Sequence, residues 1–105
     1  MTILETLDLR MAGENLDDLV ELVRRVTGPP GRLPRVDIYR HSRVQGDLHI
    51  HLYWEESARS EEPSELGLRL ASLLRVHGLV EHSVWVSPDG RAGRIEAIDQ
   101  KENRP

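Results

Sequence analysis

Histidine and tyrosine side chains recur at every second position in one short segment of the chain. His49, His51 and Tyr53 alternate with apolar residues between positions 47 and 55. Residues two apart on a β-strand project to the same side, with Cα atoms ~6.6 Å apart. Imidazole and phenol groups placed together in this way can orient a small molecule and move a proton. We therefore take these three residues as candidate catalytic residues.

A second alternating segment, residues 35–43, supplies further polar side chains. The intervening Val44-Gln45-Gly46 fits a three-residue hairpin loop with a left-handed glycine, whereas a two-residue turn would set apolar side chains opposite polar ones. The preferred loop gives the pairs His41 with His49, Tyr39 with His51 and Asp37 with Tyr53. We add His41 to the candidate catalytic residues, and we take Tyr39, Asp37 and Trp85 as candidate ligand-binding residues.

The histidine pair has three interpretations. It can hold a metal if His41 or Glu55 joins it, but His-x-His is far less specific than His-Glu-x-x-His. Acid–base catalysis requires a carboxylate such as Asp37 or Asp8 to set the histidine tautomer. Histidine and tyrosine pairs also stabilise half-solvated sheets without any further function. We assign no metal and no cofactor, and the other two interpretations stay open.

The elements that must position these residues follow from the apolar periodicity. Alternation with a period of two indicates strands at residues 2–10, 35–43, 47–55 and 80–87. Asn15 is a good N-cap for a helix that Gly28 ends, and a second helix runs from a first turn at Pro63 to Gly78. This order predicts a ferredoxin-like βαββαβ fold of the α+β class, with a four-stranded antiparallel sheet and two helices on one face.

The direction of the side chains decides which face of that sheet carries the candidate site. The apolar set that includes Leu48, Ile50 and Leu52 must face the helices, so the odd-numbered positions of the hairpin face away from them. Leu4 and Glu5 interrupt the alternation of the first strand. We further expect one domain over residues 1–99, a short fifth strand at residues 94–98 and a solvated tail at residues 100–105.

Composition limits the classes of partner. The chain has 105 residues, a formal net charge of −4 and no cysteine. This charge gives no broad attraction to nucleic acid or to anionic lipid, and the chain has no run of the ~20 apolar residues that a membrane span needs. With neither a disulfide nor a leader-like N-terminus, we expect a cytoplasmic protein. The chain also has no P-loop and no Gly-x-Ser-x-Gly elbow.

Residues 36–56 and 64–86 together resemble the dimeric α+β barrel superfamily of ferredoxin-like domains, in particular its antibiotic-biosynthesis-monooxygenase type. The resemblance covers roughly half of the chain and rests on the overall pattern, on the strand end Tyr53-Trp54-Glu55 and on the helix before the last strand. It implies a homodimer whose sheets meet face to face. It also implies that some members oxidise quinol-like substrates without metal or flavin.

Two functional hypotheses follow. In the first, the chain is a homodimeric, cofactor-independent monooxygenase-like enzyme that acts on a small aromatic or quinol-like substrate. His49, His51 and Tyr53 then orient and deprotonate a phenol, and Trp85 lines its ring. In the alternative, the chain is a non-enzymatic dimeric module of ACT-like topology that binds or senses a small molecule. In both hypotheses the chain pairs with itself through the open sheet face, and neither nucleic acid nor membrane is a partner.

Overall fold

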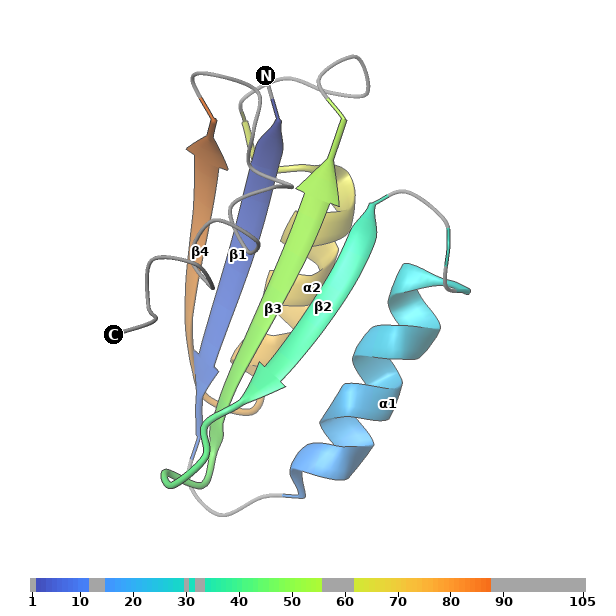
Figure 1. The fold of residues 1–105 in the computed structure, drawn as a ribbon. Helices are drawn as coiled ribbons and strands as arrows, with labels where there is room; N and C mark the ends of the chain where they lie inside the picture. Colours follow the sequence, from blue (N-terminus) through green and yellow to red (C-terminus); the bar gives the residue numbers. More distant parts are fainter. Residues whose placement is uncertain (1, 12–14, 30, 32–33, 56–61, 88–105) are drawn as a thin grey trace, which may run out of the picture.

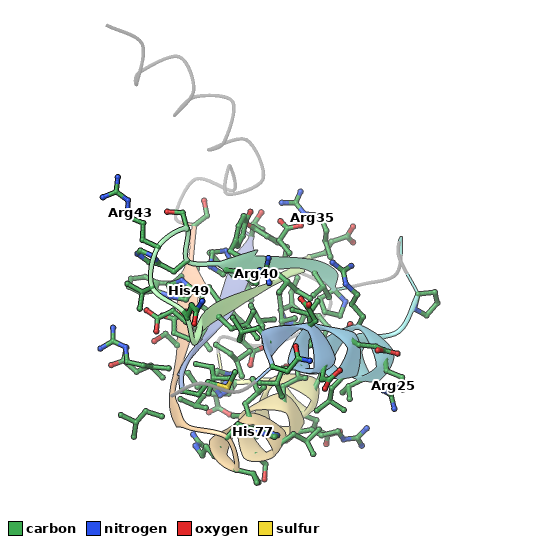
Figure 2. The ribbon with its side chains drawn as sticks, turned by 90° about the horizontal axis from the view of Figure 1, so that it is seen from below. Arg25, Arg35, Arg40, Arg43, His49 and His77 are labelled. Atoms are coloured by element: carbon green, nitrogen blue, oxygen red, sulfur yellow. The ribbon has the colours of Figure 1, made fainter. Side chains whose placement is uncertain are left out.

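Four strands form one antiparallel sheet, and two helices lie on the same side of it (Figures 1 and 2). The computed structural model describes residues 2–11, 15–29, 31, 34–55 and 62–87. The elements along the chain are β1 (Ile3–Arg10), α1 (Leu16–Thr27), β2 (Arg35–Arg40), β3 (Asp47–Trp54), α2 (Glu65–Arg75) and β4 (Leu79–Val86). The strand order β2-β3-β1-β4 confirms the predicted ferredoxin-like α+β fold. The predicted fifth strand at residues 94–98 and the tail at residues 100–105 lie outside the described residues.

Both helices begin at polar side chains that cap their first amides. The Asn15 side chain accepts a hydrogen bond from the Asp17 amide at 3.0 Å, as expected, and Gly28 ends α1 with a φ of 90°. The second helix begins later than predicted, because its N-cap is Ser64, whose hydroxyl accepts from the Gly67 amide at 2.9 Å. Pro63 therefore precedes the cap and does not lie in the first turn.

The predicted side-chain directions of the hairpin are confirmed. Leu48, Ile50 and Leu52 have no exposed surface and pack in the core beneath the helices. The side chain of His49, which points the other way, is 51% exposed. Burial of the apolar set fixes the direction of the whole strand, because a one-residue slip would exchange the two faces. The sheet thus has one face in the core and one face without helices.

The register of the β2–β3 hairpin differs from the predicted one. β2 ends at Arg40, three residues before the expected end, and the loop comprises residues 42–46. The His41 amide closes this loop by donating to the Asp47 carbonyl oxygen at 3.3 Å. The observed pairs are Asp37 with His51 and Tyr39 with His49, a shift of two positions from the prediction. A shift of two preserves the faces, so the directions hold while the neighbours change.

Two contacts explain the longer loop. The Nδ1 atom of His41 accepts from the amides of Arg43 at 2.9 Å and Val44 at 2.8 Å, which turns the chain before β2 can continue. Gly46 has a φ of 93°, and its carbonyl oxygen accepts from the Met11 amide at 2.9 Å. A Cβ atom at this glycine would overlap the Met11 carbonyl oxygen. The loop is therefore fixed against the end of β1.

Replacing Gly46 by alanine is expected to lower the free energy of unfolding more than replacing Gly28 by alanine does. Both glycines have a positive φ near 90°, but the space around Gly28 is open. Both variants thus carry backbone strain of about 1–3 kcal/mol, and Gly46→Ala adds about 1–3 kcal/mol of steric overlap. Urea denaturation of both variants measures the difference, and equal losses would contradict the proposed contact with Met11.

Candidate functional site

The open face, as we call the face of the sheet opposite the helices, carries most of the predicted site. Residues paired directly across an antiparallel sheet share a face, so the register defines its membership. The described residues on the open face are Leu4, Thr6, Asp8, Arg10, Arg35, Asp37, Tyr39, Asp47, His49, His51, Tyr53, Leu79, Glu81, Ser83 and Trp85. Of the predicted site residues, only His41 lies elsewhere. It stands in the hairpin loop, where its ring accepts two backbone amides.

His41 is therefore removed from the candidate catalytic residues. Tyr39, and not His41, lies opposite His49. The two bonds that the Nδ1 atom of His41 accepts shape the turn, which is a structural role. The predicted pairing of His41 with His49 was wrong because a three-residue loop was assumed. A side chain that accepts hydrogen bonds from backbone amides lengthens the loop without any signal in the hydrophobic pattern.

One group of residues on the open face pairs an imidazole with a carboxylate. The Nδ1 atom of His49 lies 3.5 Å from Oδ1 of Asp8, on the adjacent strand β1. A carboxylate on this side favours a proton on Nδ1 and leaves Nε2 as a proton acceptor. A depression of about 330 Å³ adjoins the pair, and Arg10, Asp47 and Glu81 also line it. This group has the arrangement that a general base requires.

A second group is an aromatic strip along β2 and β3. The ring of His51 lies between those of Tyr39 and Tyr53, with centroid distances of 5.2 Å and 6.4 Å. The guanidinium of Arg35 stands 4.1 Å from the centroid of the Tyr53 ring and also pairs with Asp37 at 3.0 Å. Tilted rings and a cation over a ring are stabilising contacts in themselves. The strip offers a planar ligand aromatic surface, but its polar groups already contact one another.

Trp85 joins neither group. Its register position on β4 is two strands away from Tyr53, because Leu4 of β1 lies between them. Its indole Nε1 donates to the Thr6 hydroxyl at 3.3 Å, and 60% of the residue is exposed. The predicted residues thus share a face without meeting at one point.

The two histidines of the pair have different neighbours. His49 is directed to Asp8, whereas His51 stacks between tyrosines. In the part of the chain that the structure describes, no group of three His, Asp or Glu side chains has a metal-binding arrangement. The contacts of His49 and His51 match what the acid–base and the structural interpretations require.

A second polar cluster, which the sequence analysis did not predict, lies on the opposite side of the sheet. Glu5 of β1 is completely buried, and its carboxylate contacts side chains or amides from three other segments. Oε1 accepts from the indole of Trp54 at 3.0 Å and from the hydroxyl of Ser64 at 2.6 Å. Oε2 accepts from the Ser64 amide at 3.1 Å and lies 2.5 Å from Nε2 of His82. We call these four residues the Glu5 cluster.

The Glu5 cluster is built for stability and not for nucleophilic catalysis. A buried carboxylate must be fully hydrogen-bonded, and the N-terminus of α2 adds a favourable dipole. The Ser64 hydroxyl donates to the buried carboxylate and accepts from the Gly67 amide, so both of its hydrogen bonds hold the start of α2 against β1. Gly67 leaves room for the carboxylate, because a Cβ atom there would overlap it. The sequence signal was present, since Glu5 and His82 each interrupt an otherwise apolar strand face.

Comparison with known proteins assigns no family. No protein-family model, no curated protein and no solved structure matches the chain. Within the described residues, neither helix is both long enough and apolar enough to cross a bilayer. The geometry of the open face is therefore the basis on which a function can be assigned.

Replacing Glu5 by glutamine is expected to lower the free energy of unfolding by about 2–4 kcal/mol, because one amide nitrogen must then face donors at a fully buried position. Glu81→Gln is the matched control, since that carboxylate lies on the exposed open face of β4. Denaturant titration of both variants measures the effect. A loss no larger than that of Glu81→Gln would show that the Glu5 cluster does not stabilise the fold.

Proposed function

We propose that the chain forms a homodimer of the dimeric α+β barrel type, in which the open faces of two copies enclose a site for a small aromatic or quinol-like substrate. On this proposal the protein is a cofactor-independent, monooxygenase-like enzyme. We place it in the cytoplasm because a chain without cysteine needs no oxidising compartment to form disulfides. The observation that carries the proposal is the His49–Asp8 pair on the wall of the 330 Å³ depression. A positioned base beside a small cavity is the minimum that proton abstraction requires.

The exposed apolar surface supports a second copy as the occupant of the open face. Tyr39, Leu79 and Trp85 are 47%, 77% and 60% exposed, and all three lie on this face. Arginines and carboxylates are interspersed among them, so one open face is complementary in charge to a copy of itself. A two-fold pairing would remove these side chains from water. The acidic groups Asp8, Asp47 and Glu81 at one end argue against nucleic acid as the occupant.

The proposed chemistry uses His49 as the base. Asp8 holds the imidazole, and Nε2 takes the proton of the substrate phenol, which yields an electron-rich phenolate. His51 and its neighbouring tyrosines supply the surface against which the ring packs. The phenolate then reduces dioxygen: one oxygen atom enters the ring, the other leaves as water, and a diol becomes a hydroxyquinone. Substrate and dioxygen balance the reaction without a further reductant.

A non-enzymatic, dimeric module of ACT-like topology that binds or senses a small molecule is the second candidate. It is favoured by the separation of the two groups on the open face. The His49–Asp8 pair and the aromatic strip do not converge on one atom of a ligand, and the depression is near the lower limit of about 300 Å³ for ligand cavities. In this candidate the same residues bind a ligand without turnover.

The dimer predicts a specific response to a charge on the open face. Trp85→Glu is expected to weaken self-association at least tenfold, because a carboxylate would be desolvated in the interface. Leu68→Glu is the control, since Leu68 is also exposed but lies on α2. Sedimentation equilibrium of the three proteins measures the dissociation constants. A wild-type chain that sediments as a monomer would exclude the proposed dimer.

The enzyme predicts turnover of naphthalene-1,4-diol to 2-hydroxy-1,4-naphthoquinone, with one oxygen atom derived from ¹⁸O₂. His49→Ala is expected to lower kcat by a factor of about 10²–10⁴, the contribution of a general base. Asp8→Asn is expected to lower it less, because it removes only the group that orients the imidazole. His77→Ala is the control, since His77 lies near α2, away from the open face (Figure 2).

Mass spectrometry of the product separates the alternatives. Oxygenation at an unchanged rate in His49→Ala would contradict the role of this residue as the base. Binding of the diol without turnover, weakened by His49→Ala and Tyr39→Ala, would support the non-enzymatic module instead.

A further inference from the structure

A groove of about 810 Å³ runs between the C-terminal half of α1 and the edge strand β2, outside the site proposed above. In Figure 1, α1 stands beside the β2 edge, whereas α2 lies behind the centre of the sheet. Val36 and Ile38 form an apolar wall of the groove on the β2 side. Arg24 and Arg25 line the groove on the α1 side. Arg35 lies at one end of the groove.

The β2 side of this groove is an edge with free hydrogen-bonding groups. The His41 amide donates to Asp47 of β3, and antiparallel ladders alternate residue by residue. The odd-numbered residues of β2 therefore bond to β3, and the amides and carbonyls of Val36 and Ile38 point outward. No backbone hydrogen bond joins these groups to another of the described residues. Such an edge is a template for one more strand.

The groove carries positive charge on its α1 side, whereas Arg35 on the other side of the strand edge pairs with Asp37 at 3.0 Å. Its charged lining consists of three arginines and one glutamate, Glu21, which lies 4.0 Å from Arg25. Arg24 has no ion-pair partner among the described residues. Figure 2 shows Arg35 on the open side of the sheet and Arg25 on the helix side. A β-strand in the groove would present its side chains alternately to the two sides, and those on the helix side would meet Arg24 and Arg25.

We propose that the β2 edge and α1 bind an extended peptide of a partner protein, with acidic and apolar residues, which adds to the sheet as a strand beside β2. Backbone hydrogen bonds to Val36 and Ile38 supply the affinity that is independent of sequence, and the arginines select carboxylates. The same positive charge opposes the pairing of two β2 edges with one another. This interaction does not depend on the proposed enzymatic function.

The probe is the blocked octapeptide EVVEEVVE, which as a strand presents carboxylates to both sides, and KVVKKVVK is its charge-reversed control. Fluorescence polarisation with the full chain is expected to show binding of the acidic peptide alone. Arg24→Glu and Arg25→Glu are each expected to weaken this binding at least tenfold. Arg43→Glu is the matched control, because Arg43 projects from the hairpin loop, away from the groove (Figure 2). Equal binding of both peptides, or an equal loss in the control variant, would overturn the proposal.

Amide hydrogen exchange tests the strand geometry itself. In the free protein the amides of Val36 and Ile38 are expected to exchange fast, and the peptide should slow both at least tenfold. The amide of Asp37, which faces β3, should be slow in both states. Peptide binding without protection of Val36 and Ile38 would exclude strand addition. Slow exchange before the peptide is added would mean that this chain or a second copy already occupies the edge, which would also overturn the proposal.

Discussion

A carboxylate without access to solvent requires a full set of hydrogen-bond donors, and this requirement organises the helix side of the molecule. Glu5 obtains its donors from the end of β3, from the N-cap of α2 and from β4, so one side chain of the central strand β1 links three other elements. The link fixes the start of α2 over the sheet. The carboxylate and its partners also fill the space beneath the start of α2.

The open face results from the placement of both helices on the other side of the sheet (Figures 1 and 2). The central strand β1 alternates, so Glu5 and Leu7 face the core while Thr6 and Asp8 face the other way. Asp8 thereby lies beside His49, on a strand whose position the Glu5 cluster determines. A base held by a carboxylate on rigid strands, and not on loops, is a sound basis for proton transfer.

The face and the edge of the sheet have different physical character and serve different partners in our proposals. The open face mixes both charges with exposed aromatic and apolar side chains, which suits a copy of the same surface. The β2 edge offers backbone groups beside an excess of arginines, which suits an acidic strand. A copy docked on the open face would leave the helix side of the groove accessible. Arg35 borders both surfaces, since it contacts Tyr53 on the face and lines the groove.

The sequence by itself determined the order of the described helices and strands, the cap at Asn15 and the face on which each hairpin side chain lies. These features depend on periodicity and local capping, which are properties of neighbouring residues. Tertiary structure alone decided which residues meet. The bonds of His41 to the backbone moved the hairpin register by two positions, and the contact of Glu5 with His82 joins residues 77 positions apart. Neither depends on a repeating pattern, because His41 accepts from amides two and three residues away and Glu5 finds its donors only in the folded chain.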